Sequence, residues 1–300
     1  MRRRNALWTR AKIIQAIRRF FVDQGYLEVE TPHRIPAPAP ETHIDAIPSG
    51  SWFLHTSPEL CMKRLLASGY EKIFQICRVW REGERGSQHT PEFTLLEWYR
   101  SGSDYWKLME ECEAMIRSVA SSTGLGEMFS FRGHTLHLSP PWERISVGDA
   151  FHRYARIPME KAREGNLFDE LIAREIEPRL GMEKPSFLYD YPAERGALAR
   201  LKNGDPALAE RFELYIGGVE LANAFSELID AGEQRRRFIA EQALRRKLMK
   251  PVYPMPEKFL EELGGMGPSA GIALGVDRLV MVLLDAPRID DVVAFSPEEL

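Results

Sequence analysis

The chain has 300 residues, of which 44% are hydrophobic and 28% charged, a composition typical of a globular protein with a substantial core. Its formal net charge of -4 argues against a protein that holds nucleic acid on a basic face. The three cysteines form no C-x-x-C pair and no apolar run reaches membrane-spanning length, which argues against structural zinc and against a membrane protein. The start does not resemble a signal peptide, so we expect a cytoplasmic protein with reduced thiols.

The N-terminal part is expected to begin with an amphipathic helix. Apolar residues from Thr9 to Gln24 recur at helical spacing, with Thr9 as the N-cap and Gly25 as the stop. Leu27 to Thr31 alternates like a strand, and the proline-rich segment 36–40 predicts an extended loop because proline cannot pair within a sheet.

Two long strands are predicted to pair as an antiparallel hairpin. They run from Lys72 to Trp80 and from Phe93 to Tyr99, on either side of the polar loop from Glu82 to Thr90. A short strand from Trp52 to Thr56 and a helix that begins near Pro58 precede them.

The rest of the chain is predicted to alternate between peripheral helices and further strands. A helix is expected over 104–121, and 142–180 is rich in helix signals, with Ser146 and Asn166 as caps. The expected strands lie at 187–191, 212–217 and 272–275, and a buried helix follows at 276–284. Strands that cluster without regular βαβ alternation predict an α+β fold around a mainly antiparallel sheet, in one domain over residues 1–300.

Charged residues within apolar surroundings mark candidate sites, because burying a charge is costly without a partner or ligand. Arg81 ends a predicted strand and Phe93 begins the returning one. A guanidinium can bind phosphate as a planar fork, and an aromatic ring can stack on a base. A solvated surface hairpin with ion pairs is the alternative interpretation.

A second candidate segment holds Glu220, Asn223 and Glu227. In a regular strand Glu220 and Asn223 would face opposite sides, but a bulge or turn could bring all three around one cavity. Two carboxylates there could hold Mg²⁺ between ATP phosphates or neutralise an ammonium group. An exposed acidic edge fits poorly with the apolar residues between them.

The third segment, from Gly271 to Arg278, is a strand of small residues that leads into a helix. An arginine in the first turn of a helix is disfavoured by the dipole unless it meets an anion such as phosphate. The stretch 265–270 matches a G-x-G-x-x-A pattern but follows a predicted helix, so we reject a Rossmann site, and the chain has no P-loop motif.

A fourth segment contains Ser57, Pro58 and Glu59 at the start of a predicted helix. An N-cap followed by proline explains these residues structurally. A helix N-terminus at a cavity would also favour a substrate carboxylate.

Taken in order, these segments resemble the three motifs of class II aminoacyl-tRNA synthetases, most closely the lysyl enzymes. Residues 25–32 resemble motif 1, which builds the homodimer interface in the family, 81–93 resemble motif 2 and 271–278 resemble motif 3. Residues 191–194 and 220–230 also resemble lysyl-type segments. The resemblance covers nearly the whole chain and implies the class II catalytic fold.

The resemblance also implies roles for single residues. Arg81 and Arg278 would be catalytic, with Arg81 on the α-phosphate and Arg278 covering one face of adenine and reaching the γ-phosphate. Phe93 would stack on adenine, and Glu220 and Glu227 would bind Mg²⁺ or ligand amines. Further contacts to ATP would come from Glu82, Gly83, Glu84, Thr90, Glu220, Leu221 and Gly275. The amino-acid pocket would consist of Ser57, Pro58, Glu59, Glu97, Tyr99, Asn223, Phe225, Glu227 and Ala273.

Motif 2 departs from the family pattern at two positions. It commonly reads Arg-x-Glu, whereas Gly83 here stands two residues after the arginine. Either Glu84 or Glu82 takes over the contacts to ATP, or Gly83 contributes its backbone alone. Thr90 replaces a frequent asparagine.

The segment before motif 1 distinguishes members of the family. Lysyl-tRNA synthetases carry an OB-fold anticodon-binding domain there, whereas one predicted helix precedes motif 1 here, so we expect neither that domain nor contact with a tRNA anticodon. This architecture resembles the short lysyl-type paralogues that attach (R)-β-lysine to a lysine of translation elongation factor P. Ser57 stands where lysyl-tRNA synthetases usually have alanine and Ala273 where they usually have glycine, changes that could favour an amino group shifted by one carbon.

The resemblance therefore implies an AMP-forming ligase that uses ATP and Mg²⁺ and acts on lysine or (R)-β-lysine, as a cytoplasmic homodimer. The amino-acid carboxylate would attack the α-phosphorus of ATP, and a protein amine would then attack the adenylate, through positioning and charge stabilisation without a protein nucleophile. The sequence identifies no base for the amine. Two alternatives stay open: an enzyme that aminoacylates a tRNA or a small amine, and a catalytically silent regulator, against which the retained charged residues argue.

Overall fold

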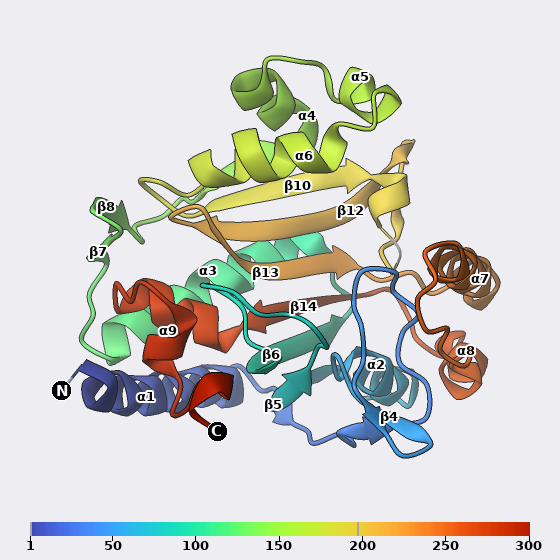
Figure 1. Cartoon of the computed structure of the whole chain (residues 1–300), viewed down its shortest axis with the longest axis horizontal. Helices are drawn as coiled ribbons and strands as arrows, with labels where there is room; N and C mark the ends of the chain where they lie inside the picture. Colours follow the sequence, from blue (N-terminus) through green and yellow to red (C-terminus); the bar gives the residue numbers. More distant parts are fainter. Residues whose placement is uncertain (1, 197) are drawn as a thin grey trace.

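A computed structural model describes residues 2–196 and 198–300, and a nine-stranded sheet forms its centre (Figure 1). The strands lie in the order β1–β5–β6–β14–β13–β12–β10–β9, with β11 paired to β12. Neighbours from β5 to β10 are antiparallel, and the outer pairs β1–β5 and β9–β10 are parallel. With helices packed around this mainly antiparallel sheet, the predicted α+β class is confirmed.

The strands of the sheet differ widely in length. In spatial order they are β1 (Leu27–Glu28), β5 (Lys72–Trp80), β6 (Glu92–Ser101), β14 (Ser269–Gly275), β13 (Val219–Ser226), β12 (Asp205–Ile216), β10 (Ser186–Pro192) and β9 (Glu143–Ser146), with β11 (Leu201–Lys202) beside β12. Two small sheets consist of β2 (Arg34–Ile35), β3 (Pro48–Ser49) and β4 (Trp52–Leu54), and of β7 (Met128–Phe131) and β8 (His134–His137). The predicted β5–β6 hairpin is confirmed along its whole length.

The first strand is shorter than the sequence predicts. β1 ends at Glu28 although the alternating pattern continues to Thr31. The Thr31 backbone N–H leaves the ladder and donates to the side-chain oxygen of Gln75 at 3.2 Å, so the chain turns away from the sheet toward the proline-rich loop.

One face of the sheet is covered by α1 (Arg2–Asp23), α3 (Tyr105–Ser122) and α9 (Val276–Leu283) (Figure 1). The three helices and the sheet share one apolar core, in which Phe21 stacks on Phe74 with ring centroids 5.0 Å apart. The prediction that Thr9 caps α1 is wrong, because the apolar stripe extends back to Ala6, which packs against this core.

The opposite face carries α2 (Glu59–Ala67), α7 (Ala231–Lys247) and α8 (Glu257–Leu263), which form a second apolar cluster with β5 and β6. Arg245 of α7 is fully buried and donates to the carbonyls of Glu41 at 2.6 Å and Ile44 at 3.1 Å, and to the Asp45 carboxylate at 2.7 Å. These bonds hold the extended loop 36–46 in place beside α7, where it becomes a wall of the cavity described below.

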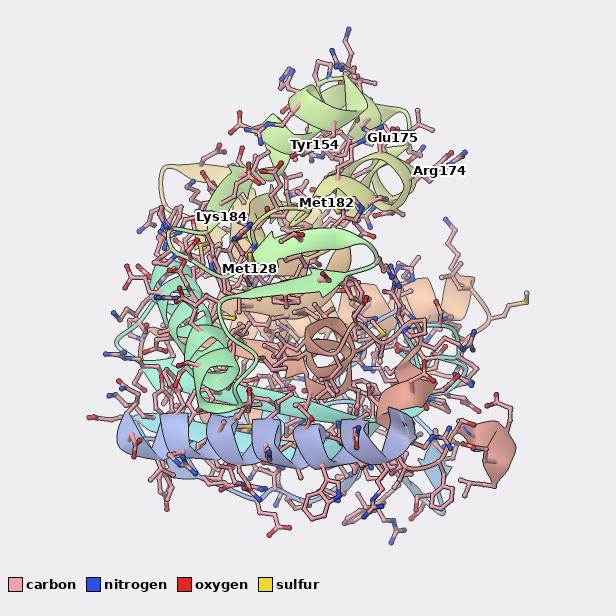
Figure 2. All side chains as sticks on the ribbon, turned by 90° about the vertical axis from the view of Figure 1, so that its left-hand side faces the viewer. Met128, Tyr154, Arg174, Glu175, Met182 and Lys184 are labelled. Atoms are coloured by element: carbon pink, nitrogen blue, oxygen red, sulfur yellow. The ribbon has the colours of Figure 1, made fainter. Side chains whose placement is uncertain are left out.

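Short helices cap the edge of the sheet beyond β9 and β10. They are α4 (Val147–Ala150), α5 (Met159–Glu164), α6 (Phe168–Leu171), the π segments Phe151–Ala155 and Ile172–Ile176, and the 3₁₀ turn Glu177–Arg179. Figure 2 shows this cap, marked by Tyr154, Arg174 and Glu175. Ser146 caps α4 as predicted, by accepting the Asp149 N–H at 3.0 Å. Asn166 does not cap α6, because its φ of 54° lies outside the extended region that an N-cap adopts.

Cys61, Cys77 and Cys112 are free thiols, as the sequence predicts. Burial raises the pKa of the Cys77 thiol to about 12, which suits a core side chain and not a nucleophile. Within residues 2–196 and 198–300, no helix is both long and apolar enough to cross a membrane.

Candidate active site

A cavity of about 570 Å³ lies between the sheet, the loop 36–46, α2, α7 and the start of α9. Its floor consists of alternate residues from β6, β14 and β13, which lie in rows across the strands. In register these rows are Leu95–Gly275, Glu97–Ala273–Asn223 and Tyr99–Gly271–Phe225. The small residues of β14 occupy the middle of the rows and leave space above them.

The bulge that would bring Glu220 and Asn223 to one side is present. The pairing of β12 with β13 changes register between Leu214 and Tyr215, and Leu221 is the extra residue. Because a bulge shifts the alternation of side chains by one residue, Glu220 and Asn223 both line the cavity.

Most of the residues singled out in the sequence line this cavity. They are Ser57, Glu59, Arg81, Glu84, Thr90, Phe93, Glu97, Tyr99, Glu220, Leu221, Asn223, Phe225, Ala273, Gly275 and Arg278. Pro58 is buried at the start of α2, whereas Glu82 and Gly83 are exposed and stand apart from the lining. Glu84 is therefore the motif 2 glutamate that faces the cavity, 3.7 Å from Arg81 Nη1.

Three carboxylates gather at one end of the cavity, which we call the acidic half: Glu59 and Glu97 line the cavity, and Glu227 lies just outside the lining, beside Gly271. Lys63 Nζ lies 2.5 Å from Glu59 Oε1 and 2.5 Å from Glu227 Oε2. In the part of the chain that the structure describes, no other cation lies within ion-pair distance of these three groups. The acidic half therefore carries an excess of negative charge.

Two hydroxyl groups hold the Glu97 carboxylate. Ser57 Oγ donates to Oε1 at 2.6 Å and Tyr99 OH donates to Oε2 at 2.7 Å. Ser57 Oγ also accepts the backbone N–H of Glu59 at 3.0 Å. Pro58, and not Ser57, occupies the N-cap position of α2, so the hydroxyl joins the first turn of the helix to the buried carboxylate.

Burial, together with the neighbouring negative charge, raises the pKa values of Glu97 and Glu227. Burial, with the negative charge of Glu59 added, raises the pKa of Glu97 to about 7. Burial also raises the pKa of Glu227 to about 8, although Lys63 opposes the shift. Because a bound ammonium group would favour the charged forms of both, the acidic half suits a ligand that brings its own positive charge.

Gly271 is required at the floor of the acidic half. A methyl carbon at this position would overlap the Tyr99 ring and lie 2.6 Å from Glu227 Oε1. Glycine therefore lets β14 pass beneath both side chains. Glu227 lies next to the cavity floor at this point, just after β13 ends at Ser226.

The opposite end, which we call the arginine half, contains Arg81, Phe93 and Arg278. The Arg81 guanidinium lies over the Phe93 ring, 5.1 Å from its centroid. The Arg81 backbone N–H donates to the Pro91 carbonyl at 2.9 Å, which fixes Arg81 at the loop end of the β5–β6 hairpin, close to Phe93. A guanidinium and an aromatic face on one wall can bind a phosphate and a base.

Arg278, in the first turn of α9, joins two other segments. Its Nη1 donates to the Glu220 carbonyl at 2.9 Å and lies 3.3 Å from the Glu220 carboxylate. Its Nε donates to the Gln88 carbonyl at 3.2 Å, and its Nη2 lies 2.5 Å from His89 Nε2. Burial and the charge of Arg278 lower the pKa of His89, so the neutral ring can accept this hydrogen bond.

An acidic half and an arginine half on an antiparallel sheet fit the class II synthetase resemblance, and comparison with known proteins supports it. The model of the tRNA synthetases class II (D, K and N) matches residues 1–299. The chain belongs to the class II tRNA synthetase family. The resemblance that the motifs carry is thereby confirmed.

Several similar proteins are elongation factor P–(R)-β-lysine ligases. The elongation factor P–(R)-β-lysine ligase of Pectobacterium carotovorum subsp. carotovorum is 41% identical, over 97% of this chain and 95% of that protein. The ligases of the same name from Mannheimia succiniciproducens and Erwinia tasmaniensis are each 40% identical, over 97% of this chain and 94% of those proteins. The similarity thus extends over nearly the full length of both partners.

Class II synthetases use ATP and Mg²⁺. The two carboxylates predicted to hold the metal, Glu220 and Glu227, do not lie together in the structure. Glu220 and Glu227 stand at opposite ends of β13, roughly 20 Å apart at about 3.3 Å per residue, so one ion cannot bind both. Glu213 on β12, which pairs in register with Asn223, lies near Glu220 instead, and both line the cavity. Burial and then the charge of Glu213 raise the pKa of Glu220 to about 7.

Glu213 belongs to a network that the sequence analysis missed. Tyr191 and Tyr215 each donate to its Oε2 at 2.6 Å. Arg211 donates from Nη2 to Glu213 Oε1 at 2.5 Å and from Nε to Asn223 Oδ1 at 2.9 Å, and its guanidinium lies over the Tyr191 ring. This fully paired cluster fixes the orientation of a carboxylate at the edge of the cavity.

Proposed function

We propose that the chain activates (R)-β-lysine, or lysine, with ATP and transfers it to a lysine side chain of translation elongation factor P. The single observation that carries the substrate class is the acidic half, where Lys63 pairs with Glu59 and Glu227, and Glu97 has hydroxyl partners in place of a cation. A diamino acid supplies two ammonium groups to balance these carboxylates. The similarity to elongation factor P–(R)-β-lysine ligases supports elongation factor P as the acceptor.

In the first step the substrate carboxylate attacks the α-phosphorus of ATP, a P–O bond forms and pyrophosphate leaves. Arg81 and Arg278 stand where the phosphates must lie if the amino groups occupy the acidic half. Their positive charges stabilise the charge that develops on the phosphoryl oxygens. The side chains orient the two substrates and none of them becomes a nucleophile.

Glu213 and Glu220 would hold the Mg²⁺ that the family uses. Their donor set fits the ion, because two carboxylates from adjacent strands plus phosphate oxygens are ligands that Mg²⁺ prefers. Within the described residues no three His, Cys, Asp or Glu side chains form a metal cluster, which suits an ion bound together with ATP. When bound, the ion neutralises phosphate charge.

In the second step the neutral ε-amine of the acceptor lysine attacks the carbonyl carbon of the aminoacyl-adenylate. An amide bond forms, the bond from the carbonyl carbon to phosphate oxygen breaks, and AMP leaves with the electron pair. The amine loses its extra proton to solvent or to a carboxylate of the cavity. Contact with a tRNA anticodon has no part in this scheme.

We propose further that the protein acts in the cytoplasm as a homodimer, through motif 1 and the preceding helix α1. Large apolar side chains are exposed there: Trp8 is 65% exposed, Val22 58% and Leu27 49%. Such side chains gathered along α1 and β1 favour a covered surface. Light scattering after gel filtration, on the wild type and on Val22→Glu, measures the oligomeric state.

Exchange of labelled pyrophosphate into ATP tests the activation step. We expect exchange that depends on (R)-β-lysine or lysine and is absent with a monoamino acid such as norleucine, because the latter leaves a carboxylate of the acidic half without its ammonium. Exchange with neither diamino acid would reject the proposed activation chemistry.

A further inference from the structure

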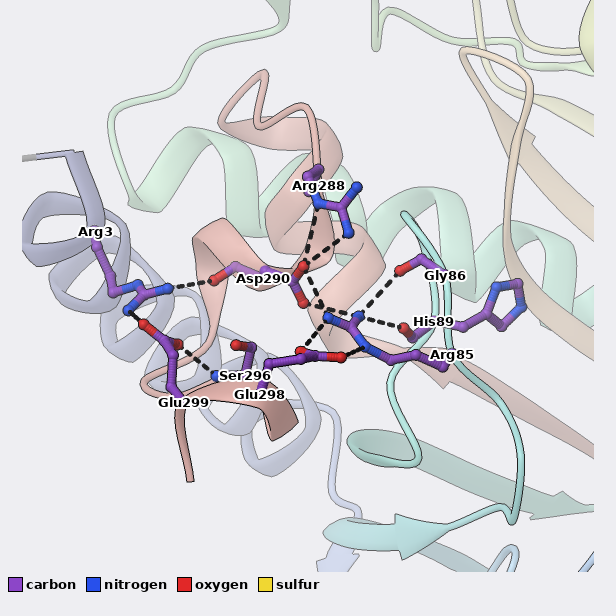
Figure 3. Close-up of polar contacts among 9 residues, drawn as sticks. All are labelled: Arg3, Arg85, Gly86, His89, Arg288, Asp290, Ser296, Glu298 and Glu299. Atoms are coloured by element: carbon purple, nitrogen blue, oxygen red, sulfur yellow. Dashed lines mark hydrogen bonds and ion pairs between the residues drawn. The ribbon is translucent and has the colours of Figure 1, made fainter.

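An exposed arginine in the loop 82–91 joins this loop to the C-terminal segment 288–300 (Figure 3). Arg85 donates to Glu298 as a fork, from Nε to Oε1 at 2.8 Å and from Nη2 to Oε2 at 2.7 Å. Its Nη1 lies 2.9 Å from Asp290 Oδ1, and its Nη2 donates to Asp290 Oδ2 at 3.1 Å. Arg85 lies outside the cavity lining, and although it falls within the motif 2 segment 81–93, the resemblance assigns it no role.

The Arg85 guanidinium also binds carbonyl groups within its own loop, 82–91. Nη1 donates to the carbonyls of Gly86 and His89, each at 3.2 Å. The backbone N–H of Ile289, beside Asp290, donates to the Ser87 carbonyl at 2.9 Å. Loop and C-terminal segment are thus joined by a backbone bond and by one arginine with four partners.

The C-terminal segment is itself anchored to the first helix. Glu299 accepts from Arg3 Nη1 at 2.5 Å and from the backbone N–H of Ser296 at 2.7 Å. Asp290 also accepts from Arg288 Nε at 3.2 Å and Nη2 at 3.1 Å. Of the two acids that bind Arg85, Asp290 is therefore also held by Arg288, and Glu298 is the neighbour of Glu299, which is held by Arg3 (Figure 3).

The loop in turn supports Arg278. The Gln88 carbonyl and the His89 ring, which follow Arg85 closely in the loop, accept two of the hydrogen bonds of Arg278. Gln88, His89 and Ile289 all line the cavity beside Arg278. A continuous chain of hydrogen bonds and ion pairs thus runs from Glu298 through Arg85 and the loop to the Arg278 guanidinium in the arginine half.

We propose that Arg85 is a positioning residue for ATP: by clamping the loop 82–91 to the C-terminal segment, it holds the surroundings of Arg278 ready for the phosphates. Single exposed ion pairs contribute little, but a bidentate fork within a network does more. Hydrogen bonds from Arg85 hold the pKa of Glu298 at about 2, so the pair stays charged at every assay pH. The proposal rests on the proposed use of ATP.

The test compares Arg85→Met with Glu298→Gln and with the control Arg117→Met. Arg117 is a partly exposed arginine that pairs with Glu127 at 2.7 Å, outside the cavity lining. ATP affinity is measured by calorimetry, and KM for ATP, KM for (R)-β-lysine and kcat by pyrophosphate exchange. Because Glu298 is 61% exposed on a terminal turn, Glu298→Gln gives a reading even if Arg85→Met folds poorly.

We expect Arg85→Met to weaken ATP binding about fivefold to tenfold, with KM for (R)-β-lysine and kcat changed less than about twofold. Glu298→Gln shifts ATP binding in the same direction by less, Arg85→Lys falls between wild type and Arg85→Met, and the control matches wild type. Unchanged ATP affinity in Arg85→Met, or equal losses for ATP and amino acid, would overturn the clamp. Lack of pyrophosphate exchange in the wild type would reject the proposed function. ATP affinity measured by calorimetry would still test the role of Arg85, because it does not depend on exchange.

Discussion

The acidic half and the arginine half of the cavity hold their charges in different ways. In the acidic half the Lys63 and Glu227 side chains are 1% and 0% exposed, and the other charges come from strand β6 and the first turn of α2. In the arginine half, Arg278 relies on a loop that Arg85 and Glu298 fasten, and these two are 28% and 61% exposed. Buried charges depend strongly on the presence of a matching partner, whereas exposed ones are screened by water and salt.

This difference fits the two kinds of ligand. An ammonium group in the acidic half meets desolvated carboxylates, so a ligand that lacks it leaves them unpaired, which costs several kcal/mol. A triphosphate carries enough charge to bind even at a partly hydrated wall. The acidic half should therefore decide which amino acid is used, and the arginine half should decide how fast ATP reacts.

The largest effect is expected from Arg278→Ala. Loss of a guanidinium that faces the reacting phosphates should lower the rate of pyrophosphate exchange about a thousandfold, while binding of (R)-β-lysine measured by calorimetry stays within about threefold of wild type. Arg117→Ala serves as the control. A fall in amino-acid affinity as large as the fall in rate would show that the two halves are not separable.

Glu97→Gln should give the reverse pattern. The amide keeps the shape and can still accept from Ser57 or Tyr99, but it removes the charge that an ammonium group meets. We expect KM for (R)-β-lysine to rise about a hundredfold, in line with about 2–5 kcal/mol for a buried charge pair, with KM for ATP nearly unchanged. Steady-state exchange kinetics measure both constants, and a rise confined to ATP would contradict the assignment.

The pH dependence separates the halves without mutation. The pKa values of about 7 for Glu97 and about 8 for Glu227 mean that both are partly protonated near neutrality in the free protein. An ammonium ligand requires the charged forms, so its Kd should fall as pH rises from 6 to 8, by about tenfold per unit for each proton released. Calorimetry across this range measures the slope, and a flat profile would argue against carboxylates as the amine site.

Glu97 and Glu227 also make the stability of the ligand-free protein depend on pH, and this stability falls, whereas ligand affinity rises, as the pH increases. Their folded pKa values lie above the ordinary value of about 4.3, so the folded state holds more protons than the unfolded state between that value and pH 7 to 8. Their contribution to stability is present at low pH and is lost as pH rises through this window. The rise in Tm on adding (R)-β-lysine should consequently be larger at pH 8 than at pH 6.

The smallest effect concerns the shifted motif 2 glutamate. Glu84 lines the cavity 3.7 Å from Arg81, whereas Glu82 is exposed. Glu84→Gln should raise KM for ATP about threefold, as expected for a partly exposed charge, and Glu82→Gln should leave it unchanged. If Glu82→Gln has the larger effect, the loop must rearrange when ATP binds.

Much of the fold follows from local patterns in the sequence. The β5–β6 hairpin and α3 are predicted because apolar periodicity and turn or capping residues agree along these segments. The start of α1 and the end of β1 are missed because they depend on contacts with distant residues, Ala6 with the core and Thr31 with Gln75. Local propensity carries no information on such contacts.

The sequence predicts most of the residues that line the site, but it does not predict which of their charged groups contact one another. Glu213 was missed although a signal exists: it and Glu220 flank Gly217 and Gly218, whose φ values of 59° and 72° form a tight hairpin turn that brings the two strands together. The Arg85–Glu298 clamp has no such signal, because its members are 213 positions apart in the chain. Register and long-range contact, which decide what each charge meets, come from the structure.

The most direct test is transfer of the amino acid. Wild-type protein is incubated with ATP, (R)-β-lysine and elongation factor P, or with tRNA in place of elongation factor P, and each product is weighed by mass spectrometry. We predict that elongation factor P gains the mass of one β-lysyl residue on a lysine side chain, that AMP and pyrophosphate accumulate with it, and that tRNA stays unmodified. An unmodified elongation factor P, with (R)-β-lysine activated but delivered to tRNA or released, would contradict the account.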